Sequence, residues 1–250
     1  MRVIRTDLEY EGTDFYGFAP QPGARTIGGE LEVALTRVTG EAIRVTPAGR
    51  TDSGVHATGQ VVSFRIESTI CLADLKRALN ALTGADVLVR AMAEADETFD
   101  ARRSAQTRRY EYSVWNGEDR NIWERRRTAH VDDPLDVEAM DEACRAVVGT
   151  HDFASFRTHR TQDDPDKSTV RRVFRAAWSR DLNDGRILRF DIEADAFLRH
   201  MVRSIVGSAL LVGHGKRPTT SIGDMLRLAN RAAAGPTAPA SGLTLREVTY

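Results

Sequence analysis

The stretch Gly49-Arg50-Thr51-Asp52-Ser53-Gly54-Val55-His56-Ala57-Thr58-Gly59 places one carboxylate in a glycine-rich segment between two strand-like runs. The run before it, residues 42–45, alternates loosely, and the run after it, residues 60–64, is rich in β-branched and aromatic residues. Glycines allow sharp turns and close backbone approach, which is typical of a loop that grips a ligand. Arg50 is placed to steer an anion or to keep Asp52 ionised. The alternative is a solvated aspartate in a surface turn.

Outward from this loop, the hydrophobic pattern predicts alternating strands and helices. In the first half, strands are expected at residues 3–10 and 87–93, and helices at 27–38, with Thr26 as N-cap, and at 72–82. In the second half, strands are expected at residues 108–115, 170–179, 187–194 and 243–248, and helices at 135–148, 197–212 and 221–234. Asn183-Asp184-Gly185 predicts a hairpin turn, and Ser221 and Asp224 have the spacing of a capping box.

This order of elements predicts an α+β fold. Hairpin-linked strands with segregated helices, and the rough repetition of the pattern, favour two ferredoxin-like halves that share a mixed, mostly antiparallel sheet with helices packed on it. The boundary is expected near residues 102–105, which gives an N-terminal half of residues 1–104 with the Asp52 loop and a C-terminal half of residues 105–250.

Composition restricts the classes of function only loosely. The chain has 250 residues, 41% of them hydrophobic and 28% charged, with a net charge of −1, so no global basic field indicates a nucleic-acid partner. Lysine occurs only at positions 76, 167 and 216, and arginine supplies the remaining positive charge. This choice is compatible with RNA binding, and high genomic GC content would produce it too. The arginine-rich stretch 101–127 fits either a polyanion groove or a salt-bridged surface.

Cysteine, histidine and apolar patterns give three further expectations. Cys71 and Cys144 lack metal-ligand spacing, so both are interpreted as packing residues of a reducing compartment. The histidines form no HxxxH or HxH pair, which argues against a metal site. No apolar run reaches membrane-spanning length, so a cytoplasmic protein without membrane contact is expected.

Two further groups of residues carry possible chemistry. In the strand around Thr107–Tyr112, Arg108 and Tyr110 fall on one face, where a tyrosine could stack on a base while arginines, Arg109 included, hold phosphates. A half-buried strand aromatic is the simpler interpretation. In the predicted helix 197–212, Arg203 flanks an apolar stripe and therefore needs an anionic partner, either in a structural salt bridge or at a catalytic carboxylate.

Taken together, these motifs resemble the tRNA pseudouridine synthase A family along nearly the whole chain. The resemblance rests on ordered segments at residues 10–18, 49–57, 108–112, 152–156, 197–207 and 238–243. It implies the pseudouridine synthase fold with a central active-site cleft. It also implies isomerisation of uridine to pseudouridine in the anticodon stem-loop of tRNA, at positions 38 to 40, by a homodimer that requires no cofactor.

The resemblance also implies roles for individual residues. Asp52 matches the catalytic aspartate, Tyr110 the active-site tyrosine, and Arg203 the arginine that pairs with the aspartate and keeps it ionised. Arg50 matches an arginine that helps to turn the target nucleotide out of the stack, a movement needed to reach a base in a duplex. His56, Arg108 and Arg109 are expected to contact the substrate.

The chain departs from the family pattern in two places, and both bear on substrate range rather than on Asp52. Ala19-Pro20 stands where the family usually has glutamine, and the segment 157–168 is acidic at Asp163, Asp164 and Asp166. The sequence does not decide whether Asp52 attacks C1′ as a nucleophile or deprotonates the sugar.

Three rival interpretations remain. Asp-Ser-Gly also occurs in aspartic proteases, but Arg50 would oppose the shared proton that an aspartate dyad needs. A non-catalytic RNA-binding module would use the same arginines and strand aromatics. A pseudouridine synthase of different RNA or site specificity is the nearest rival, and it differs from the first choice only in its substrate.

Overall fold

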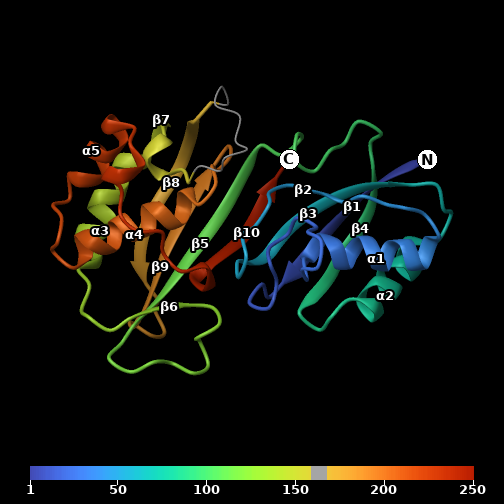
Figure 1. The fold of residues 1–250 in the computed structure, drawn as a ribbon, viewed down its shortest axis with the longest axis horizontal. Coiled ribbons are helices and arrows are strands. Elements are labelled where there is room, and N and C mark those ends of the chain that lie inside the picture. Colours follow the sequence, from blue (N-terminus) through green and yellow to red (C-terminus); the bar gives the residue numbers. More distant parts are fainter. Residues whose placement is uncertain (159–167) are drawn as a thin grey trace. The chain divides into compact units, whose positions relative to one another are not determined.

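The computed structural model describes residues 1–158 and 168–250, and these residues form two compact units (Figure 1). The first unit comprises Met1–Arg108 together with Thr244–Tyr250, and the second comprises Arg109–Leu243. The last strand of the chain therefore belongs mainly to the same unit as the first strand. The predicted division into domains after residue 104 stays a prediction.

The first unit is a βαββαβ arrangement, which is the ferredoxin-like order. Its elements are β1 (Arg2–Tyr10), α1 (Ile27–Thr39), β2 (Thr46–Pro47), β3 (His56–Ile66), α2 (Leu72–Leu82), β4 (Val87–Ala95) and the returning β10 (Leu243–Thr249). The strand order is β4-β1-β3-β10, with β2 also paired to β3. Strand β1 is antiparallel to β3 and β4, whereas β10 is parallel to β3, so the sheet is mixed.

Helix α1 begins and ends where its sequence dictates. The Thr26 side chain accepts a hydrogen bond from the Gly29 N–H, and Gly40 closes the helix in a left-handed conformation with φ 75°. Leu31 and Leu35 on its inner face are buried. Helix α1 packs against α2, and α2 packs against β4 (Figure 1). The predictions for both helices, including the Thr26 cap, are confirmed.

The second unit contains the strands β5 (Thr107–Asn116, which starts in the first unit), β6 (Ala129–Val131), β7 (Gly149–Asp152), β8 (Val170–Arg180) and β9 (Ile187–Ala194). They follow the order β5-β9-β8-β7, with β6 paired in parallel to β5. The predicted turn at Asn183-Asp184-Gly185 joins β8 to β9 as an antiparallel hairpin, in which the Asp181 carboxylate accepts from the Asn183 N–H at 2.9 Å. The α+β class with a mixed sheet is confirmed.

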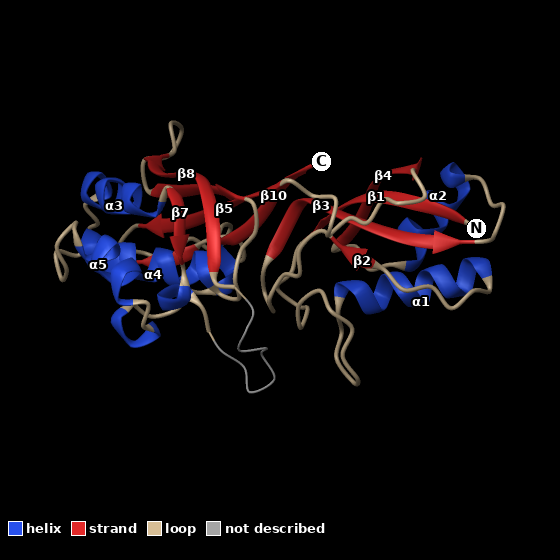
Figure 2. Ribbon diagram, turned by 90° about the horizontal axis from the view of Figure 1, so that it is seen from above, coloured by secondary structure: helices blue, strands red, loops and turns tan. Residues whose placement is uncertain are grey.

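Three helices accompany these strands: α3 (Val137–Cys144), α4 (Met201–Gly213) and α5 (Ser221–Leu228). They contact one another, and α3 also packs on β8; Figure 2 shows them grouped beside β7 and β8. The apolar stripe predicted for α4 is buried, from Met201 through Ala209. No helix in the described part of the chain is long and apolar enough to cross a bilayer.

Two predicted boundaries of the helices in the second unit are wrong because of backbone geometry. His200 has a left-handed conformation with φ 61°, so α4 starts at Met201 and residues 197–199 form a loop. Ala229 is left-handed at φ 46°, so α5 ends at Leu228 and only a short 3-10 turn, Arg231–Ala233, follows. The capping box is also wrong: the N-cap is Thr220, and Ser221 is buried inside the helix.

The other corrections concern shorter segments. The expected strand at residues 42–45 is coil, and only Thr46–Pro47 pairs with β3. The helix predicted at 135–148 is shortened to α3 followed by the 3-10 turn Arg145–Val147, and Gly149 opens β7 with φ 113°. Cys144 is buried as expected, but Cys71 is exposed and is not a packing residue. The acidic residues Asp163, Asp164 and Asp166 lie outside the described residues.

We predict that Gly207→Ala strongly destabilises the protein. A Cβ at Gly207 would lie 1.7 Å from the Pro236 carbonyl oxygen, so α4 and the segment after Gly235 could not keep their contact. The expected loss of unfolding free energy is about 3 kcal/mol, at the upper end for overpacking. Gly185→Ala is the matched control, because nothing lies within 4 Å of its added Cβ. Urea denaturation of both variants measures the difference, and equal midpoints would contradict the prediction.

Candidate active site

The Asp52 loop is held by its backbone against the loop that follows β1. Three hydrogen bonds join the two loops: Phe18 N–H to Thr51 O at 3.0 Å, Gly54 N–H to Phe15 O at 3.3 Å, and Ser53 Oγ to Phe15 O at 3.0 Å. A fourth, from Val55 N–H to Asp52 O at 3.2 Å, closes the turn itself. The Asp52 side chain is half-buried. The loop therefore fixes the backbone that carries the carboxylate and leaves the side chain partly exposed.

Glycine makes this close approach possible. A Cβ at Gly12 would lie 2.0 Å from the Val55 carbonyl oxygen, and one at Gly17 would lie 2.8 Å from that of Thr51. Gly17 also has φ +88°, a conformation that residues with a Cβ rarely adopt. Within the Asp52 loop, Gly54 has φ +80°. The two segments quoted for the family resemblance, residues 10–18 and 49–57, are thus packed backbone to backbone.

A buried hydrogen-bond network supports the same loop from the sheet. The Tyr10 hydroxyl lies 2.8 Å from Thr51 Oγ1 and accepts from Gln60 Nε2 at 3.1 Å. Gln60 Nε2 also donates to the Gly49 carbonyl at 2.8 Å. Strands β1 and β3 therefore hold the chain on the N-terminal side of Asp52. Burial raises the pKa of Tyr10 to about 12, although the hydrogen bonds with Thr51 and Gln60 favour ionisation.

Sequence reasoning missed this network. In the alternating pattern of β1, Tyr10 is indistinguishable from an ordinary core aromatic. A buried polar side chain needs a partner, so Gln60 in an apolar strand is the clue that could have been followed.

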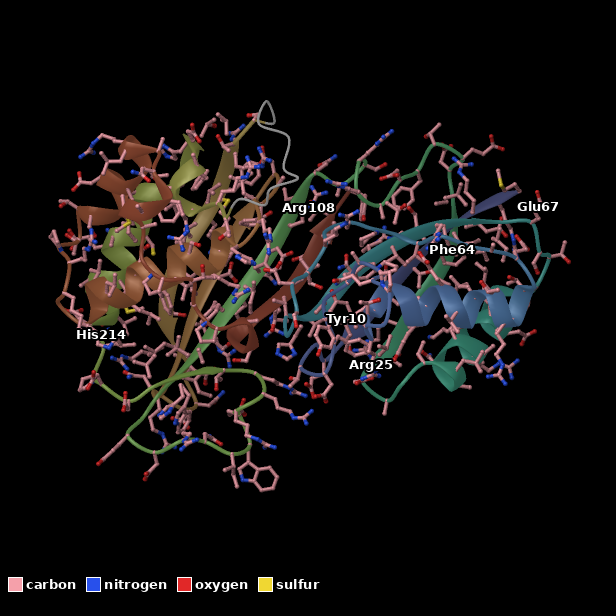
Figure 3. All side chains as sticks on the ribbon, in the orientation of Figure 1. Tyr10, Arg25, Phe64, Glu67, Arg108 and His214 are labelled. Atoms are coloured by element: carbon pink, nitrogen blue, oxygen red, sulfur yellow. The ribbon has the colours of Figure 1, made fainter. Side chains whose placement is uncertain are left out.

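Arg25 supports the facing loop. Its guanidinium lies 4.0 Å from the centre of the Phe15 ring and forms two hydrogen bonds with the Asp86 carboxylate, at 2.7 and 2.8 Å. Glu30 accepts a third at 2.6 Å. These bonds, chiefly that with Asp86, raise the pKa of Arg25. Tyr10 and Arg25 both lie near the N-terminal end of α1 (Figure 3).

His56 and Arg50 flank Asp52 in different surroundings. His56 is buried, and its Nδ1 accepts a hydrogen bond from the Gly12 N–H at 3.1 Å. This bond requires Nδ1 to be unprotonated, so His56 ties the two loops together as a neutral ring. Arg50 is exposed on the loop. Of the two, Arg50 is the side chain that a substrate can reach directly.

Arg108 has a structural environment in this protein. It is buried at the start of β5, and its guanidinium donates to three carbonyl oxygens: Ala48 (3.0 Å from Nη2), Arg102 (2.7 Å) and Ala105 (3.0 Å). The residue therefore joins the segment before β5 to the chain just before the Asp52 loop. Figure 3 labels Arg108 on β5. These carbonyl contacts favour an anchoring role for Arg108. The phosphate contact expected from the sequence stays a prediction.

In the second unit, Tyr110 and Arg203 each contact another of the segments on which the family resemblance rests. Tyr110 is buried on β5, and its ring packs edge-on against Phe197 with the ring centres 5.1 Å apart. Arg203 lies in the first turn of α4, and its Nε donates to the Ala238 carbonyl at 2.8 Å. The Ala238 N–H returns a bond to the Arg203 carbonyl at 3.0 Å, so helix and loop are joined twice.

Tyr112 completes this part of the site from the same face of β5 as Tyr110. Its hydroxyl donates to the Pro239 carbonyl at 2.8 Å. Burial raises the pKa of Tyr112, while the positive charge of Arg203 opposes that shift. Gly242 must lack a side chain here, because a Cβ would lie 2.7 Å from the Tyr112 ring.

Arg109 points to the opposite face of β5 and is half-buried. Its guanidinium lies 3.9 Å from the Asp191 carboxylate, which is also 3.8 Å from Arg175. The same face also carries the ion pair between Arg189 and Glu111, at 2.8 Å. The phosphate contact expected of Arg109 stays a prediction.

The predicted site residues fall into two groups. Asp52, Arg50 and His56 lie together in the first unit, whereas Tyr110 and Arg203 lie in the second. Among residues 1–158 and 168–250, no group of three or more histidine, cysteine, aspartate or glutamate side chains could hold a metal ion.

Comparison with known proteins identifies the family. The family model described as tRNA pseudouridine synthase matches residues 8–102 and 143–250. The chain belongs to this family. It is 42% identical over 248 residues to the tRNA pseudouridine synthase A of Geobacillus kaustophilus, covering 99% of this chain and 94% of that protein. It is 41% identical over 250 residues to that of Brevibacillus brevis, with both chains fully covered, and 41% identical to that of Chloroflexus aurantiacus, of which 89% is covered.

The resemblance drawn from the sequence motifs is thereby confirmed. Asp52 and Arg203 lie within the residues that the family model matches, whereas Tyr110 lies in the unmatched stretch between them. The fold and the family are therefore established independently of the roles assigned to single side chains.

We predict that in the Tyr10→Phe variant the free energy of unfolding falls less steeply with rising pH above pH 10 than in the wild type. The pKa of Tyr10 is about 12 in the folded state and about 10 when unfolded, so its contribution is complete below pH 10 and is lost as the pH rises towards 12. The loss amounts to roughly 2–3 kcal/mol. Burial also raises the pKa of Tyr112 and Tyr250, so the variant should still lose some stability as the pH rises.

Urea midpoints between pH 8 and pH 11 measure this slope. At pH 8 the variant should itself be about 1 kcal/mol less stable, because Thr51 and Gln60 lose a buried hydrogen-bond partner. An unchanged slope above pH 10 would contradict the assignment.

We predict that Arg108→Ala lowers stability by roughly 2 kcal/mol, because it leaves the buried Ala48 carbonyl and the partly buried Arg102 carbonyl without their donor. Arg103→Ala, at an exposed position nearby, is the matched control and should change stability by less than about 0.5 kcal/mol. Thermal and urea unfolding of both variants test this. An Arg108 variant of normal stability whose tRNA affinity has a reduced salt dependence would restore the phosphate-binding role.

Proposed function

We propose that this protein isomerises uridine to pseudouridine in the anticodon stem-loop of tRNA, at positions 38 to 40, with Asp52 as the catalytic carboxylate. The proposal is carried by the structure of the Asp52 loop. Hydrogen bonds from the loop after β1 and from Gln60 on β3 fix its backbone, while the Asp52 side chain is only half-buried. A preorganised charged group of this kind suits a reaction at a sugar carbon. We further propose that the enzyme acts in the cytoplasm as a homodimer without a cofactor.

The reaction exchanges one bond to C1′ of the ribose for another. The N1–C1′ bond breaks, the uracil rotates while bound, and a C5–C1′ bond forms; the proton lost from C5 is balanced by one gained at N1. Asp52 assists the cleavage either by attacking C1′ or by deprotonating the sugar, and both routes need its ionised form. Arg203, whose guanidinium carries a permanent positive charge, is assigned to keep that form stable.

The remaining assigned residues serve access and proton transfer. Tyr110 is assigned to the C5 proton, which it removes directly or through a base that it positions. Its buried ring, packed on Phe197, gives it a fixed orientation. The target nucleotide must leave the stack, at a cost of a few kcal/mol, and the exposed Arg50 is assigned to fill the gap or hold the displaced phosphate. His56 acts through the loop, because it ties the loop to Gly12.

We predict that Asp52→Asn abolishes turnover, with a loss of at least about 10³-fold, while tRNA binding changes less than about threefold. The substitution keeps the shape of the side chain and removes only its charge, so it affects the chemical step. Tritium release from C5-tritiated uridine in unmodified tRNA measures turnover, and filter binding measures affinity. Asp74→Asn, on the exposed side of α2, is the matched control and should retain full activity.

Substrate choice is tested in the same assay. Transcripts in which uridine is kept at only one of positions 38, 39 or 40 should each release tritium with the wild-type enzyme. Release only from uridines elsewhere would move the specificity to another site, and release by Asp52→Asn at the normal rate would remove Asp52 from the chemistry. Binding without release by either protein would favour a non-catalytic RNA-binding module.

A further inference from the structure

The connection between β5 and β6, residues 117–128, presents a large aromatic side chain to solvent. Trp123 is 87% exposed and Ile122 beside it is 63% exposed. Exposing a tryptophan ring to water is unfavourable, and an exposed aromatic beside a second exposed apolar side chain is a feature of surfaces that bind a partner. The two other tryptophans of the chain, Trp115 and Trp178, are both buried.

This connection, which we call the Trp123 loop, is built to hold its shape. The Asn121 carboxamide oxygen accepts hydrogen bonds from the N–H groups of Trp123 and Glu124, at 2.9 and 3.2 Å. The Glu124 carbonyl in turn accepts from the N–H groups of Arg127 and Thr128, at 2.8 and 3.0 Å. Trp123 is therefore displayed at the turn between two hydrogen-bonded segments, so little conformational entropy opposes binding through it.

The base of the loop is fixed to the second unit. Trp115 Nε1 donates to the Asp119 carbonyl at 2.7 Å, and the Arg186 guanidinium covers the Trp115 ring at 4.6 Å. His130 Nε2 lies 2.8 Å from the Gly117 carbonyl oxygen. In a disordered loop, the exposure of an aromatic ring would not indicate a binding site. In this hydrogen-bonded loop the ring is held in an exposed position.

The positive charge of the loop is concentrated after Trp123. The loop carries four exposed arginines, at positions 120, 125, 126 and 127, against the acidic residues Glu118, Asp119 and Glu124. Glu118 and Asp119 lie at the start of the loop, whereas three of the arginines follow Trp123 within four residues. An aromatic ring next to consecutive arginines offers a stacking surface for a base and donors for the adjoining phosphates.

We propose that the Trp123 loop is a binding site for RNA, at which an unpaired or splayed base stacks on Trp123 and the adjacent arginines contact the flanking phosphates. This inference depends on the proposed function for one point, which is that the protein binds RNA. The loop lies in residues 103–142, outside the stretches that the family model matches. It supplies a contact that is separate from the reaction at Asp52.

A second copy of the chain is the competing partner, and charge argues against it. Across a two-fold axis, identical patches face each other, so self-association through Trp123 would bring together the two runs of arginines that follow it. RNA instead neutralises all of them and releases counterions.

Tryptophan fluorescence tests the proposal directly. Because Trp123 is the one exposed tryptophan of the three, acrylamide should quench its emission readily in the free enzyme, and saturating tRNA should both quench that emission and shield it from acrylamide. Trp123→Phe should remove the signal and keep tRNA affinity within about threefold, since phenylalanine also stacks. Trp123→Ala should weaken binding roughly tenfold, which corresponds to about 1.4 kcal/mol.

Leu182→Ala is the matched control, because Leu182 is a fully exposed apolar residue in the β8–β9 hairpin of the same unit. It should leave tRNA affinity unchanged. Three results would overturn the proposal: an acrylamide response that saturating tRNA does not alter, Trp123→Ala binding tRNA as tightly as wild type, or emission already shielded in the free protein. Shielding in the free protein, with a smaller sedimenting species for Trp123→Ala, would assign the loop to contact between copies.

The outcome is independent of catalysis. If wild type binds tRNA with quenching of Trp123 but releases no tritium, the proposed reaction fails and the loop assignment stands. If wild type releases tritium and Trp123→Ala binds tRNA and turns over normally, the loop assignment fails and the reaction stands.

Discussion

The close contact between residues 12–18 and residues 49–55 is the constraint on which the rest of the candidate site depends. Neither segment forms regular secondary structure over this stretch, so its order comes from hydrogen bonds across the contact and from glycines that allow the backbones to meet. Polar side chains then secure it from the sheet, through Tyr10 and Gln60, and from its flank, through His56. The result is a carboxylate on a loop with little of the freedom that loops normally have.

In the second unit, side-chain hydrogen bonds hold another loop in place. There the loop before β10 is held on α4 by the paired bonds between Arg203 and Ala238, and on β5 by the Tyr112 hydroxyl. One arginine thus stabilises the loop through its Nε while the guanidinium lies close enough to Tyr112 to influence that phenol. Positioning and electrostatics are carried by the same side chain, which limits what can replace it. Lysine has one charged nitrogen and no planar fork, so it could not serve both needs.

Much of this architecture follows from the sequence, and the failures have physical causes. Strong periodicity located most strands and helices, and Thr26 marked the start of α1. Helix ends were misjudged where a residue other than glycine turns left-handed, as at His200 and Ala229, because such residues carry no compositional signal. The ordered family motifs identified the chemistry, but not the support of the loop by Tyr10. That support depends on a contact between residues 41 positions apart, which no local pattern encodes.

The return of β10 to the first unit makes that unit discontinuous in sequence. Thr244 and Leu245 pair with His56 and Ala57, at the start of the strand that leaves the Asp52 loop. Because residues 109–243 come between the two parts, the first unit cannot complete its sheet until the whole second unit has been synthesised. A change in β10 would therefore disturb the N-terminal unit, although the two paired strands are far apart in sequence.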